Sequence, residues 1–218
     1  MKRFLTTIAL ASSASFALAD EDHLDLTVYQ SGGTLLTGGI DHDTEIVTPG
    51  IRVFEGEFQN TGLSIFADEP GFDIPDGAFA PSAQLQLSVR KSLRVWNGSD
   101  FFSAAPTDLP LEFGPQSLTT PASDTLVGPM IFDLDDEGGL HDHPDFILNA
   151  DLTGIYLLEI EFAMDGFGTS LPAWIVFNYG LDEHDHELAV EWVAENLVPA
   201  PSTLLALSGL LALRRRRD

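Results

Sequence analysis

Short apolar segments separated by turn residues run through residues 24–178, and this pattern restricts the chain to a β-rich fold. Residues 24–29 (LDLTVY) alternate apolar and polar side chains, and residues 155–162 (IYLLEIEF) are of types that favour strands. Gly, Pro, Asp and Asn clusters bound about ten such segments. We therefore predict one mainly β domain over residues 20–198, an antiparallel β-sandwich of the jelly-roll or immunoglobulin-like type.

One segment at the end of this domain has helical rather than strand periodicity. We predict an amphipathic helix from about residue 183 to residue 196, packed on one end of the sheets. Asp182 or Asp185 can cap its start, because a carboxylate accepts hydrogen bonds from the unpaired N–H groups of the first turn. The apolar residues expected on one helical face are Leu188, Ala189, Trp192, Val193 and Leu197.

Residues 1–19 have the three regions of a secretory signal peptide. Two basic residues follow the first Met, residues 4–11 are mostly apolar, and residues 17–19 (ALA) form a small-x-small cleavage motif. The apolar part is too short for a stable membrane anchor, which needs about 20 residues. We predict cleavage between Ala19 and Asp20 after export through the Sec translocon.

Residues 199–218 combine a proline-rich motif, a short apolar segment and a basic cluster, in that order. The motif and the cluster consist of Pro199, Pro201, Ser202, Arg214, Arg215, Arg216 and Arg217. This tail resembles the PEP-CTERM sorting signal of exported bacterial proteins, with Ala200 where that family usually has glutamate. The resemblance implies transient anchoring in the inner membrane until an exosortase-type enzyme cleaves the tail. The mature protein is then expected in the cell envelope, on the outer surface or outside the cell.

The length of the apolar tail fits a transient anchor better than a permanent transmembrane helix. As a helix, residues 202–213 would span about 18 Å, well short of the roughly 30 Å hydrocarbon core. The arginine cluster would then remain on the cytoplasmic side of the membrane. The alternatives are a degenerate anchor or a packed C-terminal helix, but four arginines after an apolar run do not suit a protein core.

The domain between the two ends is strongly acidic. The chain has 10 Lys+Arg and 34 Asp+Glu, and residues 20–198 keep 4 of the basic and 33 of the acidic residues, a net charge near −29. Such a surface repels nucleic acid, so no nucleic-acid partner is expected. A solvated, salt-tolerant surface and cation binding both remain as interpretations. Arg90, Lys91 and Arg94 hold three of the four basic residues, and we predict that they pair with carboxylates.

The segment 133–162 concentrates the candidate metal ligands. If the chain is extended at His141-Asp142-His143, the two imidazoles point to the same face and suit Zn or Cu. The acids at 133–137 offer oxygen ligands that suit Ca. The chain has no cysteine, which excludes thiolate sites.

His186 is the third candidate ligand. If it precedes the helix body, it completes a three-histidine set with His141 and His143. On the helix, His184 and His186 are about 200° apart and cannot share an ion. The alternative for all these side chains is that they are solvated loop histidines in an acidic chain.

The same segment is similar to a strand pattern of bacterial surface-anchored β-domains. The matching residues are His141, His143, Phe146, Gly154 and Tyr156. That resemblance implies an architecture and not an activity. The chain has no nucleophile elbow, phosphate-binding loop or dinucleotide motif.

We therefore expect a non-catalytic structural or interaction module of the cell envelope or extracellular matrix. Envelope or matrix polysaccharide is a candidate partner, because exposed aromatic side chains would form a sugar-binding platform. The aromatic residues in question are Phe72, Phe79, Trp96, Phe101 and Phe102, for which a place in the core is the alternative. The alternative function is a metal-binding protein or metal-dependent enzyme that uses the His141/His143 loop.

Overall fold

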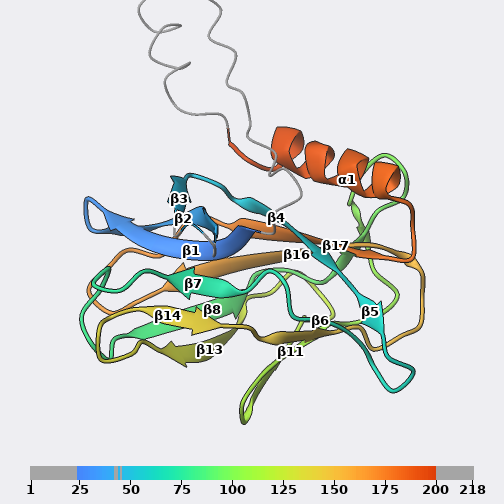
Figure 1. Ribbon diagram of the computed structural model, residues 1–218. Helices are drawn as coiled ribbons and strands as arrows, with labels where there is room; N and C mark the ends of the chain where they lie inside the picture. The colour runs from blue at the N-terminus through green and yellow to red at the C-terminus, as the bar shows by residue number, and fades with distance from the viewer. Residues whose placement is uncertain (1–23, 42–43, 45, 200–218) are drawn as a thin grey trace, which may run out of the picture.

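The described part of the chain is mainly β, as predicted. The computed structural model describes residues 24–41, 44 and 46–199, which form three sheets and one helix (Figure 1). The predicted signal peptide with its cleavage site at Ala19 and Asp20 lies outside these residues, and so does the predicted tail from residue 200 on.

The first sheet has the strand order β14-β7-β1-β2-β3. Its strands are β1 (Leu24–Ser31), β2 (Thr34–Asp41), β3 (Ile46–Pro49), β7 (Phe72–Ile74) and β14 (Leu140–Asp142). The β1–β2 hairpin turns through Gly32 and Gly33, whose positive φ angles suit glycine. β7 pairs parallel to β1 and antiparallel to β14, so it joins the start of the domain to residues more than 100 positions later.

The second sheet is built around two long neighbouring strands, β16 (Gly154–Ala163) and β17 (Ala173–Tyr179). Almost every residue of both strands is buried, which requires cover on both faces and explains their nearly continuous apolar sequence. The other strands are β4 (Val53–Glu57), β8 (Gln84–Val89), β9 (Arg94–Val95), β10 (Ser103–Ala104) and β13 (Val127–Asp133). β4 pairs parallel to β17, which differs from the predicted all-antiparallel arrangement.

The third sheet has the order β12-β11-β15-β6-β5. Its strands are β5 (Gln59–Asn60), β6 (Ile65–Ala67), β11 (Pro110–Phe113), β12 (Gln116–Thr119) and β15 (Asp145–Ile147). β6 and β7 both lie within residues 63–80, where Gly71, Gly77, Pro70 and Pro75 are typical of a loop. The prolines and glycines there limit β6 and β7 to lengths at which no periodicity is visible in the sequence. The strands that pair with them come from distant segments of the chain.

One apolar core joins side chains from all three sheets. Phe72 of the first sheet meets Phe132 and Phe162 of the second, with ring centroids 5.2 Å and 5.6 Å apart. Phe146 of the third sheet lies 4.9 Å from Phe177 of the second. Edge and tilted aromatic contacts of this kind add to the stabilisation from apolar burial, so the sheets are fixed against one another.

The helix α1 (Glu183–Asn196) lies over β17 and β4 on the outer side of the second sheet (Figure 1). Asp182 is its N-cap and accepts from the backbone N–H of Asp185 at 3.0 Å, which confirms one of the two predicted caps. The predicted apolar face is wrong in part, because Leu188 is exposed. The buried face consists of His186, Ala189, Val190 and Val193. It therefore includes an imidazole that the predicted apolar face did not contain.

Arg90, Lys91 and Arg94 pair with carboxylates, as predicted. Arg90 contacts Glu159 and Glu161, and Lys91 Nζ lies 2.9 Å from the same Glu159. Arg94 donates to Asp124. These three cations therefore stabilise buried and edge carboxylates of the second sheet.

Candidate metal site

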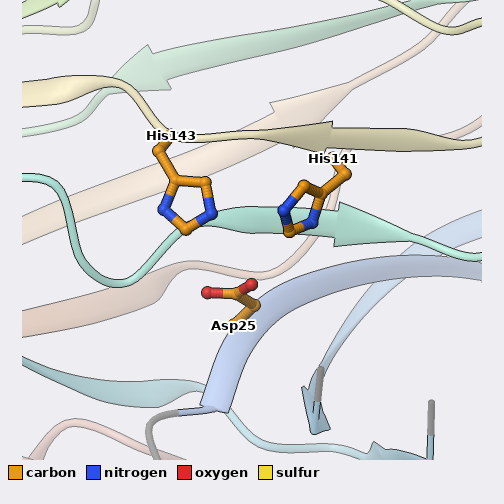
Figure 2. Close-up of side chains that lie close together, drawn as sticks. All are labelled: Asp25, His141 and His143. Atoms are coloured by element: carbon orange, nitrogen blue, oxygen red, sulfur yellow. The ribbon is translucent and has the colours of Figure 1, made fainter. Parts of the chain in front are cut away.

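Three side chains from two strands of the first sheet converge at one point. Asp25 comes from β1, His141 from β14, and His143 follows β14 directly (Figure 2). One ligand atom from each residue lies within 4.8 Å of the other two. Two imidazole nitrogens and one carboxylate oxygen at this spacing form a donor set that suits a divalent transition metal.

β7 is the strand that brings these residues together. It pairs with β14 so that His141 lies opposite Asp73, and with β1 so that Phe72 lies opposite Leu26. The rings of His141 and His143 have centroids 5.1 Å apart at an interplanar angle of 72°. The alternation of side chains along an extended chain therefore places the two histidines side by side, as their spacing predicts.

Asp25 is buried and shares its hydrogen-bond donor with a second acid. The backbone N–H of Gly71 donates to Asp25 Oδ1 at 2.8 Å and to Glu69 Oε2 at 3.0 Å. Burial and the nearby negative charge of Asp25 raise the pKa of Glu69, and the charge of His143 opposes this only in part. Two carboxylates on one amide leave excess negative charge at the site, which a bound cation would offset.

The tautomer of His143 follows from its hydrogen bond. Its Nδ1 lies 3.0 Å from the carbonyl oxygen of Asp68, and a carbonyl can only accept, so Nδ1 carries the proton. Nε2 of the neutral ring then has a free electron pair. A histidine whose second nitrogen donates to a backbone carbonyl is the usual form of a metal-binding imidazole.

Gly71 leaves the space that this imidazole occupies. A Cβ atom on Gly71 would lie 2.5 Å from Cε1 and 2.8 Å from both ring nitrogens of His143. No side chain fits at that distance, so any residue larger than glycine at position 71 displaces the ring. Gly71 has no metal-ligand chemistry of its own, and its sequence context gave no sign of this role.

His141 keeps the site open to solvent. Its Nδ1 lies 3.5 Å from Asp73 Oδ2, and its side chain is 47% exposed. Burial raises the pKa of the neighbouring Asp142, and the charges of His141 and His143 lower it in part. An ion held by Asp25, His141 and His143 would therefore keep room for water or another small ligand.

The structure separates His186 from the other two histidines, so the predicted three-histidine set does not form. His186 lies in the first turn of α1 and not in a preceding loop, and its Nε2 is 3.0 Å from the carbonyl oxygen of Val176 on β17. It groups instead with Glu55 and Glu183. The helix N-cap at Asp182 starts the helix early enough to turn His186 toward the sheet.

Asp25 is the member of this group that the sequence did not identify. The alternating pattern of β1 gives Asp25 to the polar face, but both faces of β1 are buried between Asp25 and Val28. A buried aspartate in a strand was the available signal, because burial of a charged group without a partner is costly. Recognising it requires knowing that a neighbouring segment covers this face.

The acidic loop before β14 folds on its own hydrogen bonds. Asp135 Oδ1 accepts from the backbone N–H groups of Glu137 at 2.8 Å and Gly139 at 2.9 Å, and these bonds lower the pKa of Asp135. A turn that satisfies its carboxylate in this way gives no support to the calcium interpretation. Within the described ranges, the groups with suitable spacing for a metal are the Asp25 and His186 groups.

The candidate sugar-binding aromatics divide into two sets. Phe72 and Phe79 are buried in the core. Trp96, Phe101 and Phe102 gather around Trp192 of α1, with ring centroids 5.7–6.1 Å from the Trp192 ring, and of these Phe101 is also buried. Phe101, Phe102 and Trp192 line a surface pocket with Arg94 and Lys91.

Two findings bear on membrane anchoring and on relatives. Over the described ranges, no helix is both long enough and apolar enough to cross a membrane. No protein-family model matches the chain, and no curated protein is significantly similar to it.

Proposed function

We propose that this protein is an exported, non-catalytic module of the bacterial cell envelope that binds a divalent transition-metal ion through Asp25, His141 and His143. The observation that carries the metal assignment is the approach of the three ligand atoms to within 4.8 Å. Zn²⁺ suits the set best, because it accepts both imidazole and carboxylate in tetrahedral sites with a fourth position open to water. Ca²⁺ suits it less well, since calcium prefers oxygen ligands alone.

The surroundings of the three side chains support a cation over a merely solvated pair of histidines. Asp25 is held by the Gly71 N–H, and His143 by the Asp68 carbonyl, so two of the three ligands are oriented before an ion arrives. Glu69, which shares the Gly71 N–H with Asp25, brings a second carboxylate to the site. Preoriented ligands and uncompensated negative charge both strengthen cation binding.

Gly71→Ala is expected to weaken zinc binding with little effect on the metal-free fold. The new methyl group would displace the His143 ring, which lies within 3 Å of its position. We expect the Kd for Zn²⁺ to rise by about 10–100-fold, the range found when the groups that orient a metal ligand are removed. Titration of the full metal-free chain with ZnCl₂, followed by calorimetry, measures the change.

Gly168→Ala serves as a control, because its φ, like that of Gly71, is not positive, and a Cβ atom there would meet its nearest neighbour, Thr34 Oγ1, at an ordinary contact distance of 3.5 Å. The control should bind zinc as the parent chain does. Equal zinc affinity in Gly71→Ala and the parent chain would contradict the role of the His143 ring.

The proposal of export rests on the residues at the two ends of the chain. The signal-peptide regions of residues 1–19 and the PEP-CTERM-like tail of residues 199–218 support passage through the Sec translocon and an exosortase-type enzyme, with transient anchoring in the inner membrane. The strongly acidic composition and the lack of cysteine are compatible with an extracellular surface. The apolar core shared by the three sheets supports a β-sandwich as the architecture, with two parallel pairings among its strands.

Deletion of residues 199–218 is expected to redirect the protein from the envelope to the soluble exported fraction. The reason is that the deleted segment contains all of the apolar tail and the arginine cluster. Fractionation of cells that express the full and shortened chains measures this. As a control, replacing Arg214, Arg215, Arg216 and Arg217 by Ala alone should also impair sorting. An unchanged distribution of the shortened chain would exclude the sorting function of the tail.

The cluster around Trp192 supports polysaccharide as a partner of this module. Phe102 is 75% exposed, and aromatic faces beside Arg94 offer the stacking and hydrogen-bonding groups that sugars use. The residues of this cluster are distant along the chain from Asp25, His141 and His143.

A further inference from the structure

His186 is a buried imidazole whose second nitrogen faces only carboxylates. Its side chain is 3% exposed, and Nε2 lies 3.0 Å from the carbonyl oxygen of Val176. Since the carbonyl can only accept, Nε2 carries the proton and Nδ1 is the nitrogen that remains. Nδ1 has no hydrogen bond to any described residue.

Three glutamate oxygens surround this nitrogen. Glu55 Oε2 lies 3.8 Å from Nδ1, Glu57 Oε1 lies 3.7 Å away, and Glu183 Oε1 lies 4.0 Å away. A neutral Nδ1 directs its electron pair toward negative oxygens, although the glutamate side chains themselves are 36–70% exposed. A cation between the imidazole and the acids would offset this repulsion.

The distances leave room for an ion. All three exceed the length of a hydrogen bond, so none of the acids accepts a hydrogen bond from Nδ1 as they lie. Two ligand atoms bound to one tetrahedral Zn²⁺ are separated by roughly 3.4 Å, which small side-chain rotations reach from 3.7–4.0 Å. Glu57 Oε1 also accepts from Asn178 Nδ2 at 2.9 Å. Glu55 and Glu183 are the acids whose ligand atoms, with that of His186, all lie within 4.8 Å of one another.

We propose that His186, Glu55 and Glu183 form a second site for a divalent transition-metal ion, with Glu57 as a nearby charge. Their ligand atoms all lie within 4.8 Å of one another. The backbone bond of His186 Nε2 orients Nδ1 as in other metal-binding histidines, and imidazole with carboxylates selects Zn²⁺ over Ca²⁺. Bound metal would fasten the first turn of α1 to β4 of the second sheet.

This site does not depend on the proposed function of the Asp25 group, and the test separates the two. The full chain with His141→Ala and His143→Ala serves as the background, so that zinc at the first site is removed. After chelation and dialysis against micromolar ZnCl₂, we expect this background to retain one zinc per chain by elemental analysis. At 100-fold excess of zinc over Kd, its thermal midpoint should rise by about 5–10 °C.

Adding Glu55→Gln and Glu183→Gln should abolish both the bound zinc and the thermal shift. Both side chains are at least partly exposed, and glutamine keeps their size, so the fold is expected to survive. Glu191→Gln on the exposed side of the same helix removes one charge without touching the group, and it should retain the zinc. Circular dichroism of each variant verifies that α1 is still formed.

Two results would overturn the second site. One is a background variant that binds no zinc. The other is zinc that remains bound after the glutamate changes, since histidines elsewhere would then be the ligands. A count of one zinc per chain in both the parent chain and the background would reject the Asp25 site and leave this one standing.

Discussion

Replacing His141 and His143 by alanine is expected to weaken binding of the first zinc ion by at least about 100-fold. Loss of a group that merely orients a ligand costs 10–100-fold, and this variant removes two of three ligands outright. The metal-free protein should lose little stability, because His141 is 47% and His143 31% exposed, and exposed substitutions usually change stability by about 0.5 kcal/mol or less. Competition with a chromophoric zinc chelator measures the affinity.

The same measurement in the parent chain should depend on pH. Zinc competes with protons for imidazole nitrogens, so its affinity should fall as the pH is lowered. His184→Ala is the matched control, since this histidine is 76% exposed on α1 and belongs to neither ligand group. If the double variant keeps the first zinc ion at parental affinity, Asp25, His141 and His143 are not its ligands.

Phe177→Ala is expected to destabilise the domain by about 3–5 kcal/mol, the range for truncation of a buried aromatic residue. Phe177 is completely buried in β17 and lies between Phe58, at 4.8 Å, and Phe146, at 4.9 Å. A Cβ atom on Gly56 of β4 would lie 2.6 Å from its ring, so the ring fills space that Gly56 leaves open. Its loss would leave a cavity where the second and third sheets meet.

Thermal or urea denaturation of the metal-free chain measures this effect, which corresponds to a fall in melting temperature of about 10 °C. Phe102→Ala is the control, because it makes the same chemical change at a side chain that is 75% exposed. Its stability should change by less than about 1 kcal/mol. Equal losses in the two variants would mean that Phe177 does not contribute to the core as described.

Local pattern was sufficient for much of the secondary structure. The alternation in residues 24–29 and the strand-forming run in 155–162 both lie within observed strands, because side chains of a strand alternate whatever sheet the strand joins. The helix was also placed closely, since its cap and its period are local features. The buried face of the helix was not placed correctly, because the side of a helix that is buried depends on the sheet against which it packs. His186 packs against β17, and Leu188 is exposed.

Residues 63–80 show where local pattern was insufficient. β6 and β7 have only three residues each, too few to show a period, and their strand form depends on partners in β5, β15, β1 and β14. β7 is also the strand that brings Asp25 of β1 beside His141 and His143. The fold of the site therefore could not be derived from its own residues.

The sequence by itself determined that His141 and His143 share a face, because the spacing of two along an extended chain fixes their relative direction. It also determined the acidic surface and the pairing of Arg90, Lys91 and Arg94 with carboxylates, since few cations are available to so many acids. Only the tertiary structure decided which residues join these histidines. Asp25 is 116 positions before His141, and parallel pairing of β1 with β7 brings it there, while α1 directs His186 to Glu55 and Glu183. Ligand groups form between segments that are distant along the chain, and sheet topology, which residue spacing does not encode, sets which segments meet.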